Sequence, residues 1–125
     1  MAAKGKRGDR IAERLRAELM NLLLRGAVRD PAVRDALVTT VRVSADLRHA
    51  RVYVRLLDPM ATETRQQALI SGLARAAPFV RRELAPKLAL KYQPELKFFW
   101  DDGLDDATRI EALLEEVRNE SKGTS

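Results

Sequence analysis

Two stretches of alternating apolar and polar residues, 37–43 and 49–57, follow each other with only the five residues "SADLR" between them. Both stretches, "LVTTVRV" and "HARVYVRLL", are rich in β-branched or aromatic residues and repeat with the period of two that indicates a strand. One face would carry Thr39, Val41 and Val43 in the first stretch and Ala50, Val52, Val54 and Leu56 in the second. The short connection predicts a hairpin, with Ser44 and Asp46 bonding to their own backbone.

A third alternating stretch begins after Pro94, in "PELKFFW". Leu96, Phe98 and Trp100 alternate there with polar or exposed positions, which predicts a third strand with Phe98 and Trp100 in the core. Three short strands need cover on one face, so helices are expected to form a second layer in an α+β arrangement.

Helical periodicity precedes the hairpin. Apolar residues form one stripe on a helix expected to start at Asp9, which would cap it, and to stop at Gly26. The stripe consists of Ile11, Leu15, Leu19, Leu22 and Leu23. Asp30 precedes a proline and is pushed out of helical geometry, so "VRDPAVRDA" reads as a connection.

A second helical pattern runs from about Thr62 and contains Pro78 in "LARAAPFVRREL". Proline lacks the N–H that would bond to the Ala74 carbonyl and crowds that carbonyl, so it should kink one helix or start another. Pro86 is expected to fray the end of the pattern. An acidic amphipathic helix is expected from Asp105.

Composition excludes several classes of structure and function. At 125 residues the chain fits a single folded domain, and with no cysteine and one histidine it offers neither disulfides nor multi-histidine metal sites. The N-terminus is basic without a following apolar segment, and no apolar run reaches the length of a membrane span. We expect a cytoplasmic protein, neither secreted nor membrane-spanning.

Charge is unevenly distributed. Residues 1–100 hold 20 Lys and Arg against 10 Asp and Glu, whereas residues 101–125 hold 3 against 8. The basic part predicts a polyanionic partner, nucleic acid first and an anionic membrane surface second, with a merely solubilising surface as the alternative. The acidic segment would cover apolar surface or compete with RNA for the basic face.

Helix–kink–helix framed by strands of a small sheet resembles the type II KH nucleic-acid-binding domains. Nearly the whole chain is similar to the ribosome-binding factor A family, through "RGDRIAERLRAELMNLL", "VTTVRVSADLRHARVYVRLLD", "FVRREL" and "PELKFFWDDGLDDATRIEALL". The patterns along the chain predict the order α-β-β-α-kink-α-β with an additional C-terminal acidic helix, which agrees with this resemblance. It divides the chain into a flexible basic arm (1–8), a KH-like RNA-binding domain (9–104) and an acidic helix with a frayed tail (105–125).

The resemblance also implies a non-catalytic, monomeric maturation factor without cofactors. It would bind 16S rRNA in the free small (30S) ribosomal subunit, act in late assembly and pre-rRNA processing with a role in cold adaptation, and cooperate with assembly GTPases. One position departs from the family. The Ala-x-Gly interruption of its paired helices corresponds here to Ala76, Ala77 and Pro78, so proline stands in place of glycine.

Basic residues around this break suggest a phosphate-binding site, since helix starts favour anions and arginine forks match phosphate oxygens. The predicted RNA-binding residues are Arg75, Ala76, Ala77, Pro78, Arg81, Arg82, Lys87 and Lys91, with Arg7 and Arg10 opening the first helix. A solvated helix surface is the alternative. Arg51, Tyr53 and Arg55 share one strand face and could stack bases, or be ordinary strand formers on an open face.

The sequence gives little support for a catalytic function. His49 is the only histidine and is expected in the hairpin, and no nucleophile motif or phosphate loop is present. Asp101, Asp102, Asp105 and Asp106 lack calcium-loop spacing and precede a helix, which favours capping over a metal. No enzyme is expected, and the alternative to an assembly factor is a basic KH-like adaptor that docks an acidic protein or another structured RNA.

Overall fold

The computed structural model describes residues 2–103, with side chains from Arg7 onward. The acidic helix expected from Asp105 lies outside the described residues. The elements are α1 (Ala2–Leu24), a 3-10 helix η1 (Pro31–Val33), β1 (Ala36–Val43), β2 (His49–Leu56), α2 (Glu63–Leu88) and β3 (Glu95–Trp100). The predicted order of elements up to the third strand is therefore confirmed.

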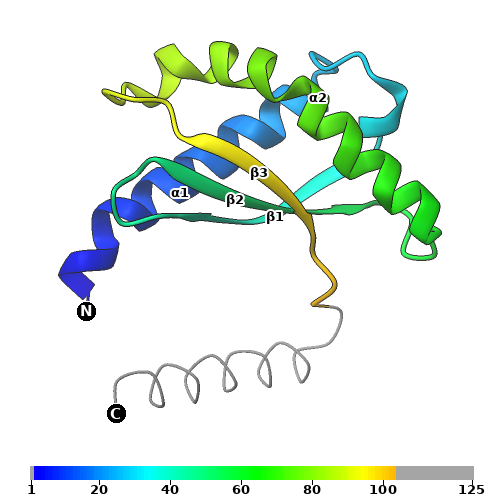
Figure 1. Ribbon diagram of the computed structural model, residues 1–125, viewed down its shortest axis with the longest axis horizontal. Coiled ribbons are helices and arrows are strands. Elements are labelled where there is room, and N and C mark those ends of the chain that lie inside the picture. Colours follow the sequence, from blue (N-terminus) through cyan, green and yellow to red (C-terminus); the bar gives the residue numbers. More distant parts are fainter. Residues whose placement is uncertain (1, 104–125) are drawn as a thin grey trace.

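The three strands form one sheet in the order β1-β2-β3, which Figure 1 shows below α2. β1 and β2 pair antiparallel through the predicted hairpin, whereas β2 and β3 pair parallel, because α2 carries the chain back between them. In the hairpin, Asp46 accepts hydrogen bonds from the Ser44 hydroxyl at 2.6 Å and the Arg48 N–H at 3.0 Å.

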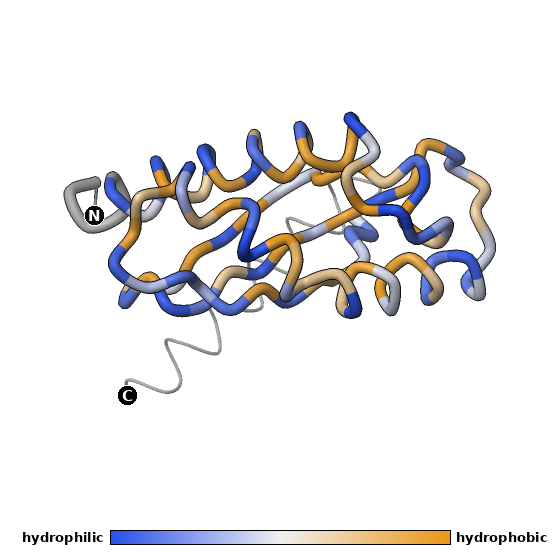
Figure 2. Tube along the Cα trace, turned by 90° about the horizontal axis from the view of Figure 1, so that it is seen from above, coloured by the Kyte–Doolittle hydropathy of each residue, from blue (hydrophilic) through white to orange (hydrophobic). Residues whose placement is uncertain are grey.

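Both helices cover the same face of the sheet. Seen from above in Figure 2, α1 and α2 run in opposite directions along the two sides of the strands, and hydrophilic colour marks the outer edge of the α1 turns. Leu15, Leu19 and Leu22 of α1 are buried with Leu69, Leu73, Val80 and Leu84 of α2. They pack with the inward residues of β2, which are Ala50, Val52, Val54 and Leu56, as predicted, and with Leu96 and Phe98. Trp100 is only partly buried.

The inward face of β1 differs from the prediction because a bulge interrupts the strand. The register with β2 shifts between Val38 and Thr40, so Val38 and Val41 are both buried although they lie three residues apart. Thr39 instead turns its hydroxyl to the Asp101 carboxylate at 2.6 Å and to the Tyr53 carbonyl at 3.2 Å. The predicted face of Thr39, Val41 and Val43 is therefore wrong at Thr39.

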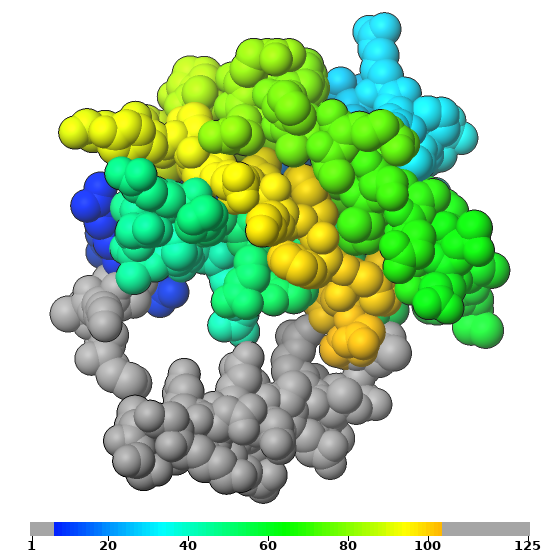
Figure 3. Space-filling model, in the orientation of Figure 1, coloured from blue at the N-terminus to red at the C-terminus, as the bar shows by residue number. Residues whose placement is uncertain are grey.

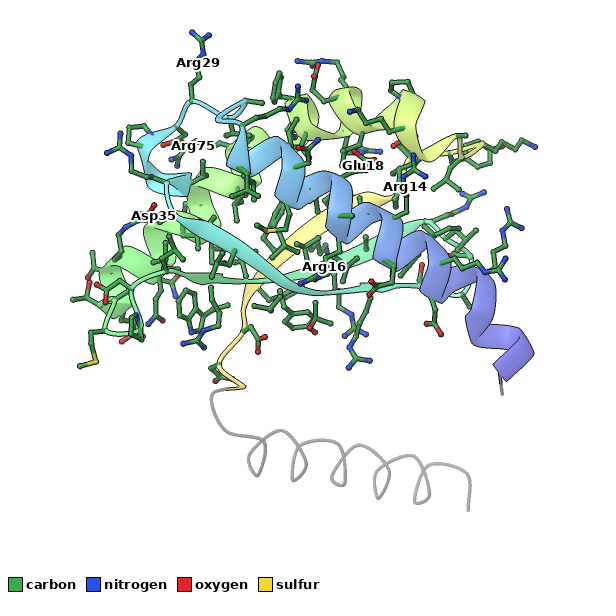
Figure 4. All side chains as sticks on the ribbon, turned by 180° about the vertical axis from the view of Figure 1, so that it is seen from behind. Arg14, Arg16, Glu18, Arg29, Asp35 and Arg75 are labelled. Atoms are coloured by element: carbon green, nitrogen blue, oxygen red, sulfur yellow. The ribbon has the colours of Figure 1, made fainter. Side chains whose placement is uncertain are left out.

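α1 also protects the free edge of β1. The Arg16 Nε donates to the Thr39 carbonyl at 3.2 Å, and the Val38 N–H approaches the Met20 sulfur at 3.0 Å. Figure 4 shows Arg16 reaching the strands from α1. An edge strand whose polar backbone groups are occupied in this way is a poor template for pairing with another chain.

The helices differ from the prediction at the start of α1 and agree with it at the kink in α2. α1 begins at Ala2 instead of Asp9, so Asp9 is not its N-cap and the helix includes most of the expected arm. α2 is one helix that contains both Pro78 and Pro86 and ends at Leu88, where Ala89 takes a left-handed conformation. Figure 1 shows that α2 changes direction along its length. The kink alternative for Pro78 therefore holds, and α2 ends two residues after Pro86, close to where the end of the helical pattern was expected.

Candidate nucleic-acid interface

The second half of α2 and the loop that joins it to β3 form the centre of the candidate interface. Arg82 and Lys91 are exposed there, and neither forms an ion pair within residues 7–103. Lys87 is also exposed and lies 3.7 Å from the Glu18 carboxylate of α1. At this separation and exposure an ion pair is weak, so a phosphate can compete for the lysine.

The strand hairpin extends this basic surface. The Glu95 N–H donates to the Arg48 carbonyl at 2.8 Å, which holds the hairpin beside the loop after α2. Tyr92 in that loop is 57% exposed, with the Arg48 guanidinium 5.1 Å and the Lys91 ammonium 5.4 Å from its ring centre. Figure 3 shows this loop, in yellow, next to the blue-green hairpin at one end of the molecule. Arg48 and Tyr92 were not among the predicted site residues.

Arg81 has a different role from its neighbours. Its side chain is partly buried and its Nη2 donates to the Gln93 carbonyl at 3.0 Å, so it fastens the loop before β3 to α2. Its Nε is buried and has no hydrogen-bond partner among the described residues. Arg81 therefore supports the basic surface by holding the loop in place. Its substitution would disturb the loop as well as remove a charge.

Arg75 lies apart from this cluster, on the side of α2 that faces the connection after α1. Its Nη2 donates to the Asp30 carboxylate at 2.8 Å, and Figure 4 shows it close to this connection, which also carries Arg29. The Ala32 backbone N–H and then the Arg75 guanidinium hold the pKa of Asp30 below its ordinary value. Arg75 is thus already paired, which makes it a weaker phosphate ligand than Arg82 or Lys91.

The three residues of the predicted interruption divide between core and surface. Ala76 and Ala77 are partly buried and pack against the core, whereas Pro78 is exposed. Small residues at the first two positions therefore serve packing, and Pro78 is the exposed member of the three.

Arg7 and Arg10 are exposed on the first turns of α1. Figure 1 shows the start of α1 and the end of α2 at the same end of the molecule, on the left in that view. Arg7 and Arg10 therefore lie at the same end of the fold as the predicted cations near the end of α2. Arg75 lies away from this end.

The face of the sheet opposite α1 and α2 carries further cations that the linear sequence did not reveal as a group. Arg51 pairs in register with Arg42 on one side and Lys97 on the other, and all three are exposed. Arg55 is occupied: its Nη1 donates to the Asp101 carbonyl at 2.6 Å and its guanidinium lies 5.2 Å from the Trp100 ring centre. Strand register was the missing signal for Arg42 and Lys97.

Within residues 2–103 no helix is long and apolar enough to cross a membrane. In the same range, no three His, Cys, Asp or Glu side chains gather as a metal site would require. His49 lies at the start of β2, exposed, with its Nδ1 3.9 Å from the Glu95 carboxylate.

The element order defines a small α+β domain of the type II KH-like class, with exposed cations gathered at one end. The comparison with protein families is more specific. The model of the family "Ribosome-binding factor A" matches residues 7–114, and the chain belongs to this family.

Curated relatives agree. The chain is 40% identical over 123 residues to Ribosome-binding factor A of Sorangium cellulosum, covering 98% of both chains. It is also 40% identical over 112 residues to that of Syntrophobacter fumaroxidans, covering 90% of this chain and 94% of the relative.

Solved structures are similar as well. A Thermotoga maritima protein described as a putative ribosome binding factor A is 30% identical with a TM-score of 0.59, covering 82% of this chain and 92% of its own. A Thermus thermophilus ribosome binding factor A homology model, fitted into the cryo-EM map of a 30S complex, is 27% identical with a TM-score of 0.53. It covers 71% of this chain and 94% of its own.

Proposed function

We propose that this protein is an assembly factor of the small ribosomal subunit, which binds 16S rRNA in the free 30S particle during late maturation and pre-rRNA processing. Membership of the ribosome-binding factor A family carries the proposal, and the Thermus thermophilus relative fitted into a 30S complex supports the choice of subunit. The role is non-catalytic, cytoplasmic and monomeric, assists growth in the cold and involves cooperation with assembly GTPases.

The exposed cations at the end of α2 are the proposed contact with rRNA. Arg82, Lys87 and Lys91 lie on one helix end and its following loop, with Arg48 on the hairpin beside them. Phosphate contacts of this kind position a protein on folded RNA through shape and charge, without reading a base sequence. Arg81 supports the surface by holding the loop, and Pro78 gives α2 the bend that presents its second half.

Co-sedimentation with purified 30S subunits and 70S ribosomes at two salt concentrations tests the proposal. We expect wild type to migrate with 30S only, and Arg82→Glu/Lys91→Glu to lower the 30S affinity at least tenfold. If about five phosphates are neutralised, affinity should fall by orders of magnitude over a few-fold rise in salt. Arg81 is left unchanged because its substitution would also release the loop at Gln93.

The matched control is Arg29→Glu/Arg34→Glu, which makes the same change in charge on the connection near η1. At the higher salt concentration, where long-range attraction is screened, it should retain most of the 30S binding, and circular dichroism of both variants should match wild type. Absence of wild-type binding to 30S would overturn the function. Binding that is insensitive to salt and survives ribonuclease treatment would instead favour an adaptor for an acidic protein.

A further inference from the structure

The face of the sheet opposite the helices carries two rows of side chains that cross the strands. The first row contains the cations Arg42, Arg51 and Lys97, one from each strand in direct register. The second row, two residues away from the first on each strand, contains Thr40, Tyr53 and Phe99. Neither row was assigned a role in the proposed interface on α2.

The cation row is unfavourable for folding by itself. Like charges placed directly opposite each other on neighbouring strands repel, because strands lie only about 4.8 Å apart. No acidic side chain within residues 7–103 forms an ion pair with any of the three. A hollow of about 230 Å³ lies among them, lined also by Val43, Ser44 and His49. Such an arrangement becomes favourable when an anion occupies it.

The aromatic row beside it identifies the kind of anion. The Tyr53 and Phe99 rings lie 5.6 Å apart with an interplanar angle of 30°, and Phe99 is 39% exposed although it is a large apolar side chain. Rows two residues apart on a strand are separated by about 7 Å. This spacing is comparable with the reach from the phosphate of a nucleotide to its base.

We propose that this face is a platform for single-stranded RNA, in which Arg42, Arg51 and Lys97 contact phosphates while a base stacks on Phe99 beside Tyr53. Exposed aromatic rings next to a cationic groove are the features with which proteins bind single strands without sequence preference. An acidic peptide would pair with the cations but would leave the aromatic rings without a stacking partner. The inference rests on the proposed function and adds a second contact with unpaired rRNA.

Fluorescence anisotropy with a labelled ten-nucleotide oligouridylate tests the platform separately from the 30S interface. Wild type should bind at low salt. Phe99→Ala should weaken binding about five- to one-hundred-fold, the range measured for loss of one stacked base. Arg51→Gln/Lys97→Gln should weaken binding and reduce the slope of log affinity against log salt by about 1.4, the value for two lost phosphate contacts on a single strand.

Two matched variants serve as controls. Arg29→Gln/Arg34→Gln removes the same charge elsewhere and should leave oligonucleotide binding within about twofold. Arg82→Glu/Lys91→Glu should lower the 30S affinity at least tenfold, yet weaken oligonucleotide binding less than Arg51→Gln/Lys97→Gln does. Failure of wild type to bind 30S would refute the proposed function. Normal binding of wild type to 30S without binding to the oligonucleotide would refute only the platform.

Two further outcomes would also overturn the platform. The first is an equal loss of binding in the Arg29→Gln/Arg34→Gln control, which would mean that net charge alone is responsible. The second is oligonucleotide binding that appears only after Glu111→Gln/Glu115→Gln/Glu116→Gln, because the acidic segment of the chain would then be the occupant of this face.

Discussion

Arginines dominate the cations of this protein, and their surroundings divide them into two groups. Arg16, Arg65 and Arg81 use their forked donors on backbone carbonyls of neighbouring elements. Arg65, for example, reaches the Ala32 carbonyl at 2.7 Å and the Arg34 carbonyl at 2.9 Å. Arg42, Arg51 and Arg82 have no such partner within residues 7–103. Arginines that are already held by the protein are less available to a phosphate, so an arginine count overstates the binding surface.

Asp30 provides a prediction at the scale of a single residue. Its carboxylate accepts hydrogen bonds from the Ala32 N–H at 2.9 Å and from Arg75 at 2.8 Å, which lower its pKa from the ordinary value of 3.8. A lowered folded-state pKa stabilises the fold above the unfolded-state pKa, and this stabilisation is lost as pH falls through the folded-state pKa. The Asp30→Asn variant should therefore be less stable than wild type at neutral pH.

Urea unfolding across pH checks this expectation. The difference in free energy of unfolding between wild type and Asp30→Asn should shrink as pH falls below about 4. Arg75→Gln removes the charged partner and serves as the comparison, because Asp30→Asn should cost less in that background. A difference that stays constant from pH 7 to pH 2 would contradict the argument.

α2 shows how an element can keep two prolines inside it. An interior proline removes a hydrogen bond and costs about 3 kcal/mol or more. The helix nevertheless continues, because buried residues lie on both sides of Pro78, with Leu69 and Leu73 before it and Val80 and Leu84 after it. Both halves of α2 are held on the sheet, and the proline bends the helix instead of ending it.

Close packing of α2 against η1 gives a prediction at the scale of elements. A Cβ added at Gly72 would lie 3.0 Å from the Ala32 Cβ and 3.2 Å from a Val33 methyl carbon. The Ala32 Cβ cannot rotate away, so the two elements must separate. We expect Gly72→Ala to destabilise by about 1 kcal/mol, because overpacking of about 1–3 kcal/mol exceeds the helix-propensity gain of about 0.5–1 kcal/mol.

Gly8 in α1 is the matched control, since an added Cβ there would meet nothing within 4 Å. Gly8→Ala should be neutral or stabilise by up to about 1 kcal/mol through helix propensity alone. Urea midpoints of the two variants should therefore shift in opposite directions. The same direction of shift in both would mean that α2 and η1 can separate without cost.

Charge asymmetry acts at the scale of the whole molecule. The basic part of the chain carries 20 Lys and Arg against 10 Asp and Glu, and the last 25 residues reverse this balance with 3 against 8. The summed field of a protein changes both the rate and the strength of its association with a polyanion, and salt screens this effect. The acidic segment should therefore weaken binding to RNA even from a distance.

Glu111→Gln/Glu115→Gln/Glu116→Gln removes three of these negative charges without shortening the chain. Its affinity for 30S should rise several-fold at low salt and return to that of wild type at high salt, where long-range attraction is screened. Co-sedimentation over a salt series measures both limits. An increase that persists at high salt would indicate a direct contact of the segment with the RNA-binding surface.

Sequence periodicity determined the α+β class, the hairpin and the buried face of β2, because residues that alternate or recur every three to four positions must share a face in any compact fold. Composition determined that the chain is basic, which predicts a polyanionic partner. The resemblance to a known family supplied the expectation of a 30S partner.

Tertiary structure alone decided several other features. The bulge moved Thr39 off the predicted inward face of β1, because a register shift depends on the partner strand. α2 continued through Pro78, because packing on both sides outweighs a local helix breaker. Arg81 holds the loop at Gln93 through a hydrogen bond, which the local sequence does not indicate. Arg42 and Lys97 lie beside Arg51 because strand pairing brings together segments that are far apart in the chain. Local pattern specifies which face a side chain occupies, but only the packed fold specifies which side chains share that face.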